Sequence, residues 1–343
     1  MKRISTSVIA AAVFAVCSGL QAHAAPVLAL PAANCGTTQA NNCVQYGNFS
    51  VYSLGLLYTQ AVFGSTGVIP TTNPNPGDPF YVKSAPGELG NPGYIVYGTG
   101  TNNQGVVTNG AGTLIDDAQQ LPTGGGALSP YATGAGTETA PAFAGDTTTK
   151  WDGTLSAVRS ELGAGGQFIT YFNLNETGND GLAGLDLLAW LHVTLVDVNN
   201  GLVQKDYYLG GSTAPSLTNI ADPNWVTVHG TICVSATAGF LGFGPCNQAQ
   251  KNAGGKDVNQ NLGANTAAFA IFNQELSDLV LNSNYDFIRV EGRLSQINNG
   301  YEQIFSALSG RSQKIPEPGS LPLLGVALGG IALAGLKRLR REA

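Results

Sequence analysis

The sequence predicts a mainly β protein: an antiparallel β-sandwich of the jelly-roll kind with one amphipathic helix. Short segments rich in β-branched and aromatic residues alternate with clusters of Gly, Asn and Pro, as strands joined by turns do. The chain contains 46 glycines, about twice the average usage, and only 11% of its residues are charged. The helical crossovers of a parallel α/β fold are missing from the pattern, which favours an antiparallel arrangement.

In the first part of the chain, strands are expected in three places. Residues 44–63 predict one or two strands, and residues 80–84 and 93–98 predict shorter ones, because aromatic and β-branched residues are concentrated there. A Pro- and Gly-rich turn at 73–79 separates the first two places. Residues 98–149 are rich in Gly, Thr, Asn and Ala, so we expect long surface loops with interrupted strands.

The most regular strands are expected after residue 150. Residues 167–177 and 187–198 have strand-like composition, and the second segment is expected to form a hairpin with 202–210. The Asn-Asn-Gly sequence between them contains residue types that accept the left-handed conformation of a tight hairpin turn. Residues 225–235 predict another strand.

A helix and a second hairpin are expected towards the end of this region. The helix is predicted at about 266–281, with Asn265 or Thr266 as its cap. Apolar residues recur there with helical spacing and form a single stripe, namely Phe269, Phe272, Leu276, Leu279 and Val280. Residues 285–297 and 301–308 flank another Asn-Asn-Gly sequence and predict the hairpin.

The N-terminus has the three-part layout of a secretory signal peptide. A basic start precedes a short apolar run at 8–16, and Ala22 and Ala24 supply the small residues that a cleavage site requires. The apolar run is too short to span a membrane. We therefore expect residues 1–24 to be removed on export and residues 25–312 to form the exported body.

The distribution of charge argues against nucleic acid as a partner. The chain has 16 Lys and Arg against 22 Asp and Glu, and six of those basic residues lie in the first three and last seven positions. The body is therefore strongly acidic, and it contains no cluster of basic residues with interleaved aromatics. Such a surface is repelled by a phosphate backbone.

Three features follow one another at the C-terminal side of the body. Pro316, Glu317 and Pro318 precede the uncharged segment 319–336, and four basic residues come next: Lys337, Arg338, Arg340 and Arg341. A helix of that segment's length spans about 27 Å, just enough to cross a hydrocarbon core. The basic residues are expected to stay on the cytoplasmic side. By physical chemistry alone this is a C-terminal membrane anchor.

Taken together, these features resemble the PEP-CTERM sorting tail of exported bacterial proteins. The resemblance implies that exosortase, a membrane protease-transpeptidase, recognises the tail at 313–343 and releases or transfers the body. It also implies a Gram-negative setting in which extracellular polysaccharide is made. The protein is then anchored in the inner membrane first and reaches the cell surface or the extracellular space afterwards.

The four cysteines outside the signal segment are expected to form disulfides. An even number of cysteines in an exported chain is typical of disulfide bonding, and four cysteines allow three connectivities. We favour Cys35–Cys43 and Cys233–Cys246, because each pair brackets turn-rich sequence. Zinc is disfavoured, since the spacing is not CxxC-like.

A calcium site is one hypothesis for the Asn- and Asp-rich segment 171–186. Its oxygen-bearing side chains include Asn173, Asn175 and Asp180, which are ligand types that Ca²⁺ takes. The segment departs from the EF-hand pattern, because Gly184 stands where a bidentate Glu belongs. The alternative is an Asx-rich turn that bonds to itself.

No catalytic motif is evident. The region after the signal has two histidines, His192 and His229, but no G-x-S-x-G sequence to place a nucleophile. The three tryptophans and twelve tyrosines can act as stacking platforms for sugars or as core residues. We therefore expect a non-catalytic surface or matrix protein associated with exopolysaccharide and biofilm. A carbohydrate- or calcium-binding module is the first alternative, and a secreted hydrolase is the second.

Overall fold

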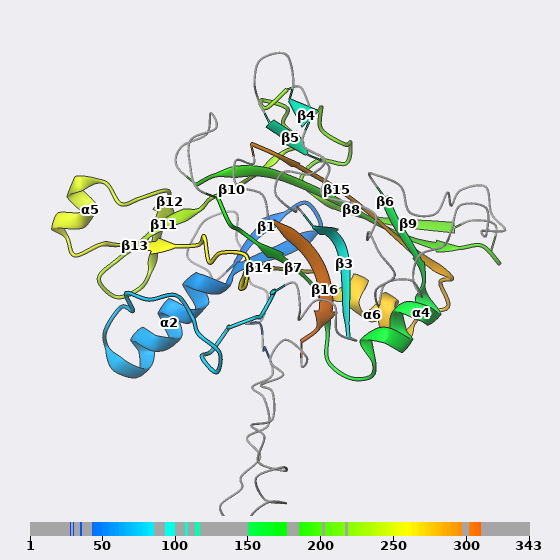
Figure 1. Cartoon of the computed structure of the whole chain (residues 1–343), viewed down its shortest axis with the longest axis horizontal. Helices are drawn as coiled ribbons and strands as arrows, with labels where there is room; N and C mark the ends of the chain where they lie inside the picture. The colour runs from blue at the N-terminus through cyan, green and yellow to red at the C-terminus, as the bar shows by residue number, and fades with distance from the viewer. Residues whose placement is uncertain are drawn as a thin grey trace, which may run out of the picture. The chain divides into compact units, whose positions relative to one another are not determined.

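The computed structural model describes residues 28, 30, 35, 43–85, 93–99, 107–108, 114–116, 150–176, 185–200, 203–216, 219–296 and 302–309 (Figure 1). Their fold is mainly antiparallel β, as the sequence predicts, and all paired strands in its three sheets are antiparallel. The expected signal peptide and sorting tail lie outside the described residues and stay predictions. Within the described part of the chain, no helix has the length and apolarity needed to span a membrane.

A six-stranded sheet forms one layer of the body. Its order is β1-β2-β14-β7-β16-β3, which are Cys43–Tyr46, Phe49–Ser53, Ala267–Phe272, Phe168–Asn173, Gln303–Leu308 and Tyr94–Thr99. All residues of the three strands β14, β7 and β16 are buried. Polar groups in such strands need partners, and the hydroxyl groups of Thr170 and Ser306 meet this need by pairing at 2.9 Å.

A seven-stranded sheet forms the facing layer. At its centre β8 (Leu187–Asp197) pairs with β15 (Phe287–Ser295). β10 (Val226–Val228) and β9 (Val203–Leu209) pair with β8. β6 (Lys150–Thr154) and β5 (Leu114–Asp116) pair with β15, and β4 (Val107–Thr108) pairs with β5. The β8–β9 pair is the first hairpin expected from the sequence, and it is confirmed.

The main hydrophobic core lies between these two sheets. Alternate residues of β8, from Leu187 to Leu195, belong to it together with apolar residues of β2, β7, β14 and β16. Helices α4 (Leu155–Leu162) and α6 (Gln274–Asn282) add buried residues to the same core. A second core includes residues of α2 (Leu54–Thr66) and of strands β2, β7, β14 and β16 that are not in the first. The six-stranded sheet is therefore covered on both faces.

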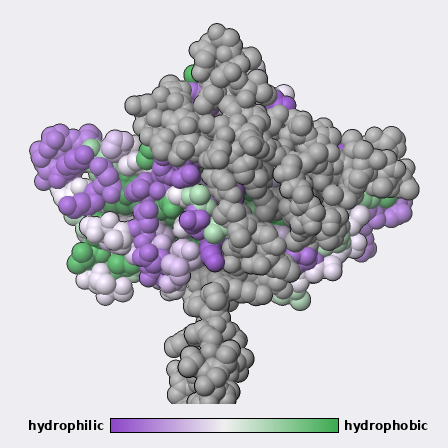
Figure 2. All heavy atoms as spheres, viewed as in Figure 1, coloured by the Kyte–Doolittle hydropathy of each residue, from purple (hydrophilic) through white to green (hydrophobic). Residues whose placement is uncertain are grey.

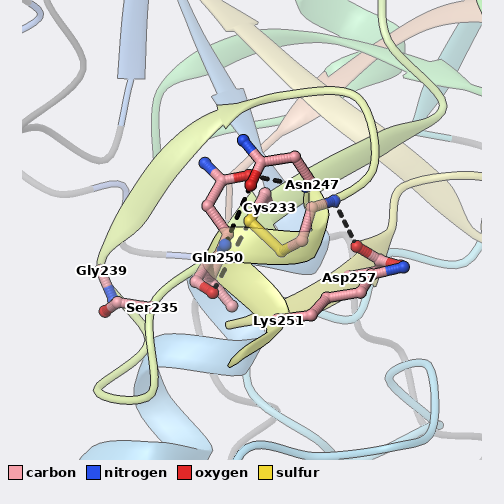
Figure 3. The surroundings of a disulfide bond; sticks show 9 residues. Cys233, Ser235, Gly239, Asn247, Gln250, Lys251 and Asp257 are labelled. Carbon is pink, nitrogen blue, oxygen red and sulfur yellow. Dashed lines mark hydrogen bonds and ion pairs between the residues drawn. A yellow bond between two sulfur atoms is a disulfide. The ribbon is translucent and has the colours of Figure 1, made fainter. Parts of the chain in front are cut away.

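The third sheet is small and is held by a disulfide (Figure 3). Its order is β12-β11-β13, comprising Phe240–Phe243, Thr231–Val234 and Lys256–Asn259. The Cys233–Cys246 bond, with Cα atoms 4.8 Å apart, ties β11 to the residues before α5 (Gln248–Asn252). Nearby, the N–H of Cys246 donates to Asp257 Oδ1 at 2.6 Å. A reciprocal capping box between Asn247 and Gln250 starts α5.

Both disulfides expected from the sequence are present, because Cys35 and Cys43 are also bonded, with Cα atoms 4.9 Å apart. One bond fixes the start of β1 and the other fixes the third sheet. In the space-filling view, hydrophilic residues gather over α5 (Figure 2), which agrees with the finding that this helix has no buried residue.

The helix predicted at 266–281 is wrong in its first half. Residues Ala267–Phe272 form strand β14, and only Gln274–Asn282 form helix α6. The strand sequence is apolar at every position, so it suits a strand buried on both faces as well as one side of a helix. Asn273 caps α6, since its Oδ1 accepts a hydrogen bond from the N–H of Leu276 at 2.8 Å.

The strand expectation for 44–63 is likewise right only up to Ser53. Beyond β1 and β2 the chain turns into helix α2, and Ser53 Oγ accepts a hydrogen bond from the N–H of Leu56 at 3.1 Å. This helix buries six consecutive residues of its first half, so it lacks the single apolar stripe that indicates a helix. The expected single helix is therefore corrected to four helices among the described residues, α2, α4, α5 and α6.

The second expected hairpin is wrong as well. β15 belongs to the seven-stranded sheet and β16 to the six-stranded one, so the two strands lie in different layers and do not pair. Turn chemistry carries no information about which sheet receives the second strand. Residues 225–235, expected as one strand, form two strands in different sheets, β10 and β11. Gly230 lies at the break between them, where a Cβ would collide with Leu185.

The remaining strand expectations have mixed outcomes. The strand expected at 93–98 is confirmed as β3, and that at 167–177 is confirmed as β7. Residues 80–84 form only one isolated bridge, between Lys83 and Thr266. In the loop-rich segment 98–149, the short strands β4 and β5 lie among the described residues.

Candidate functional site: an apolar cavity between the sheets

An apolar cavity lies between the two large sheets where β1 and β2 face β8 and β10. The empty space at this position, counted together with the adjoining open solvent, is about 880 Å³. Its principal lining residues fall into three groups, called here the floor, the roof and the rim. The floor is Val44, Tyr46, Val51, Ser53, Phe172, Phe269, Ile271 and Ile304; the roof is Ala189, Leu191, Leu209, Val226 and Val228; and the rim is His229, Ile232, Phe240, Phe243 and Gln260.

The floor results from the register of the six-stranded sheet. Val44 on β1 lies opposite Val51 on β2, which in turn lies opposite Ile271 on β14. Val44 and Val51 are only half-buried, although they line the space between the layers. An inner residue that stays half-buried has too few neighbours on one side, and the cavity is the cause.

The roof is the inner face of the seven-stranded sheet. Leu191 of β8 lies opposite Leu209 of β9, and Ala189 of β8 lies opposite Val226 of β10. Ala189 is the smallest of the alternate β8 residues that belong to the core, so its side chain fills less of the space between the sheets than its neighbours on β8 do. All five roof residues are aliphatic, which gives this side of the cavity no hydrogen-bonding side chain.

The turn between β1 and β2 ties the two layers together beside the floor. The N–H of Asn48 donates to the carbonyl of Tyr208 at 2.9 Å, and the N–H of Tyr208 donates to Asn48 Oδ1 at 2.8 Å. Gly47 precedes this contact with a φ of 56°, and a Cβ at Gly47 would collide with the Tyr208 carbonyl. Glycine is therefore required for the close approach of β9 to this turn.

At the rim, aromatic side chains reach the surface. Phe243 is 39% exposed, and its ring stacks on the imidazole of His229 with centroids 4.4 Å apart. Phe240 meets Phe243 edge-on at 5.2 Å. Leu241, the residue after Phe240 on β12, is 42% exposed. Two large apolar residues exposed on one short edge strand are unusual for a surface that faces only water.

Asp186 and Gln260 hold His229 in place at the rim. His229 Nδ1 donates to Asp186 Oδ2 at 2.8 Å, while Asp186 Oδ1 accepts the N–H of Gly230 at 3.0 Å. Gln260 is 2% exposed, and its Nε2 donates to the carbonyl of His229 at 2.7 Å. The imidazole is thus oriented by its Nδ1, and its Nε2 has no hydrogen-bond partner among the described residues.

One further polar group lies on the floor. Tyr46 is half-buried, and burial raises the pKa of its phenol. The phenol therefore stays protonated at neutral pH. The other hydroxyl of the floor, that of Ser53, is engaged as the cap of α2.

A second His–Asp pair lies on the outer face of the seven-stranded sheet. His192 Nε2 is 2.8 Å from Asp206 Oδ1, and its ring stacks on Tyr208 with centroids 4.3 Å apart. Thr194 donates to the same carboxylate oxygen at 2.9 Å, and Glu291 Oε2 lies 4.0 Å from His192 Nδ1. These side chains bond to one another across β8, β9 and β15, so the cluster cross-links three strands.

The residues expected to bind calcium have different surroundings. Asn173 is 0% exposed; its Nδ2 donates to the Ala264 carbonyl at 3.1 Å and to Gln303 Oε1 at 3.3 Å, and it therefore braces β7 against β16. The N–H of Asn175 donates to Glu302 Oε1 at 3.2 Å. Asp180 lies outside the described residues. No group of three or more His, Cys, Asp or Glu side chains in the described ranges is placed to hold a metal.

The tryptophans considered as sugar platforms lie mostly in the interior. Trp151 and Trp190 are each 2% exposed, and the indole N–H of Trp190 donates to the carbonyl of Gly211 at 2.8 Å. Trp225 is half-buried. Trp151 and Trp190 thus have no exposed ring face on which a sugar can stack.

Sequence reasoning did not identify the cavity. Its lining residues come from three sheets and from segments far apart in the chain, so no local pattern brings them together. One local signal is present: the sequence FLGFG at 240–244 is an apolar, Gly-containing run between the two cysteines of a disulfide. That segment contains β12 and two residues of the rim.

The fold and the cavity define a class: a mainly antiparallel β protein in which two large sheets pack around an apolar cavity and a disulfide-bearing third sheet supplies its rim. The chain belongs to the family described as Domain of unknown function (DUF8239), whose model matches residues 28–293. This match includes every lining residue named above except Ile304. Comparison with curated proteins gives no match. Comparison with solved structures gives none either.

Proposed function

We propose that this protein is an exported, non-catalytic component of the bacterial cell surface or extracellular matrix, associated with exopolysaccharide and biofilm. The observation that carries the proposal is the tail, in which Pro316, Glu317 and Pro318 precede an uncharged segment and a basic cluster. Exosortase is the processing partner in this proposal. The full arrangement is a signal peptide at 1–24, a jelly-roll-like body, and a transmembrane helix at about 319–336 that anchors the body before processing.

The two disulfides of the body support an exported location. Disulfides form and persist in oxidising compartments, whereas cytosolic thiols are kept reduced. The acidic, Gly-, Asn- and Thr-rich composition suits a secreted surface protein. Neither observation identifies the processing enzyme, so the test is aimed at the tail.

The test is the intact mass of the protein recovered from its native host, before and after reduction. Processing at the tail predicts a mature chain that starts near residue 25 and ends near residues 316–318, with or without an added group. The matched control replaces all three residues, Pro316→Ala, Glu317→Ala and Pro318→Ala, and it should accumulate with the tail attached. A wild-type mass that runs through Ala343 would contradict the sorting proposal and leave a plain membrane anchor.

A further inference from the structure

We propose that the cavity between the sheets is a binding site for a single-chain amphiphile, a molecule with one fatty-acyl-like chain and a small oxygen-containing head group. The chain lies between the floor and the roof, and the head group lies at His229 on the rim. This inference does not depend on export or on processing of the tail, because it concerns the described body alone.

The chemistry of the lining selects an apolar occupant. The roof is entirely aliphatic, and the floor is apolar except for the hydroxyl groups of Tyr46 and Ser53. A water molecule inside a protein needs two to four polar partners, and such walls do not offer them along the cavity. Burying a hydrocarbon chain there removes apolar surface from water on both partners, which is favourable.

The shape of the cavity fits one chain. Two sheet faces form its long walls, and the half-buried Val44, Val51 and Val228 mark where wall residues lack protein neighbours. A chain that fills this space gives those side chains the contacts they lack.

The rim indicates where the head group lies. His229 and Gln260 place polar side chains at one corner, and the exposed Phe243 shows that this corner reaches solvent. Asp186 holds His229 through Nδ1, which leaves Nε2 for a ligand. A hydroxyl can donate to neutral Nε2, and a carboxylate can accept from the protonated ring. Both head groups therefore fit the same chemistry.

The test measures binding of 11-(dansylamino)undecanoic acid to the full chain with its disulfides intact, kept in solution by a fluorinated surfactant. The emission of this probe rises in an apolar site. We compare wild type with Val51→Trp. Val51 lies in the middle of the cross-strand row that forms the floor, so the larger side chain fills part of the cavity. The matched control is Val203→Trp, the same change at a strand residue that is 44% exposed and does not line the cavity. Probe bound to the uncharged tail is common to all three proteins and cancels in the comparison.

The proposal expects Val51→Trp to weaken probe binding at least tenfold, while Val203→Trp leaves it unchanged. A second variant guards against misfolding: Phe243→Ser alters only an exposed rim residue and should weaken binding several-fold with an unchanged circular dichroism spectrum. Competition with 1-dodecanol and with dodecanoate then identifies the head group, because the better competitor carries the head that His229 accepts.

Three results would overturn the inference. Equal probe binding by wild type, Val51→Trp and Phe243→Ser would mean that only the tail binds the probe. Displacement by neither dodecanol nor dodecanoate would mean that the cavity does not take a single-chain amphiphile. The inference is also overturned if wild type binds no probe and Val51→Trp lowers stability. A segment of the chain itself would then fill the cavity.

Discussion

The space between the two large sheets differs in packing between the end beside α4 and α6 and the end beside β1 and β10. Beside the helices, Trp151, Leu155, Leu162 and Val280 are at most 2% exposed. Beside β1 and β10, Val44, Val51 and Val228 stay half-buried although their side chains are equally apolar. The difference therefore comes from what covers each end and not from composition. The cavity is a local feature of an otherwise well-filled core.

The filled end is also held by hydrogen bonds between its helices. Arg159 of α4 donates to the carbonyls of Val280 and Ser283 at 2.6 and 2.8 Å, which satisfies backbone groups at the end of α6. Partial burial lowers the pKa of this guanidinium, yet the group stays charged at neutral pH. At the cavity end, the corresponding cover is the rim, which the Cys233–Cys246 disulfide holds.

The largest effect is expected from Trp151→Ala at the filled end. The indole is 2% exposed and packs edge-on against Tyr97 with centroids 5.1 Å apart, so its removal leaves a void that the helices cannot close. We expect a loss of about 3–5 kcal/mol in the free energy of unfolding. Urea denaturation followed by circular dichroism measures it. A loss below about 1 kcal/mol would show that this end is not tightly packed.

The next largest effect is expected from removing the disulfide at the rim. Replacing Cys233 and Cys246 by Ser should cost about 3 kcal/mol, because the bond closes a loop with a separation of 13 residues. The matched control replaces Cys35 and Cys43, whose separation is 8, and should cost slightly less. The first pair should weaken probe binding more than the second, because Cys43 is one wall residue at the start of β1 whereas Cys233–Cys246 holds the whole rim. If both pairs weaken it equally, the rim has no special role.

A small effect is expected from Val51→Ala on the cavity floor. This side chain already lacks contacts on the side that faces the cavity, so we expect a loss of less than about 1 kcal/mol. The same denaturation experiment measures it beside Trp151→Ala. A loss as large as that of a fully buried residue would contradict the difference between the two ends.

The smallest effect is expected from Glu275→Gln on α6. Lys205 on β9 hydrogen-bonds to the Glu275 carboxylate, and Tyr207 donates to it at 3.2 Å; together these contacts lower the pKa of Glu275. Because the pKa of Glu275 is lower in the folded state than in the unfolded state, the ionised carboxylate stabilises the fold at pH values above the unfolded-state pKa. This contribution disappears as the pH falls through the folded-state pKa. The pair is largely exposed, so we expect less than about 1 kcal/mol at pH 7.

The test for this pair is the difference in unfolding free energy between wild type and Glu275→Gln, measured at pH 7 and at pH 3. The difference should shrink at the lower pH and in high salt, because the carboxylate is protonated or screened. A difference that grows at pH 3 would contradict the assigned ion pair.

The sequence predicts features that depend on local pattern. The β8–β9 hairpin and both disulfides are confirmed, because each depends on neighbouring residues or short loops. The helix expected at β14 and the pairing expected between β15 and β16 are wrong, because both depend on strands far away in the sequence. The cavity could not be predicted for the same reason: its floor requires the register of β1, β2 and β14.

The difference between the two ends is tested most directly by methyl NMR of the full chain during titration with 1-dodecanol. Our account predicts shifts at the methyl groups of Val51, Leu191 and Ile271, which line the cavity, and none at Leu155, Leu162 and Val280 beside the helices. Shifts at the helix end, or no shifts at either end, would contradict the assignment of the cavity as a binding site.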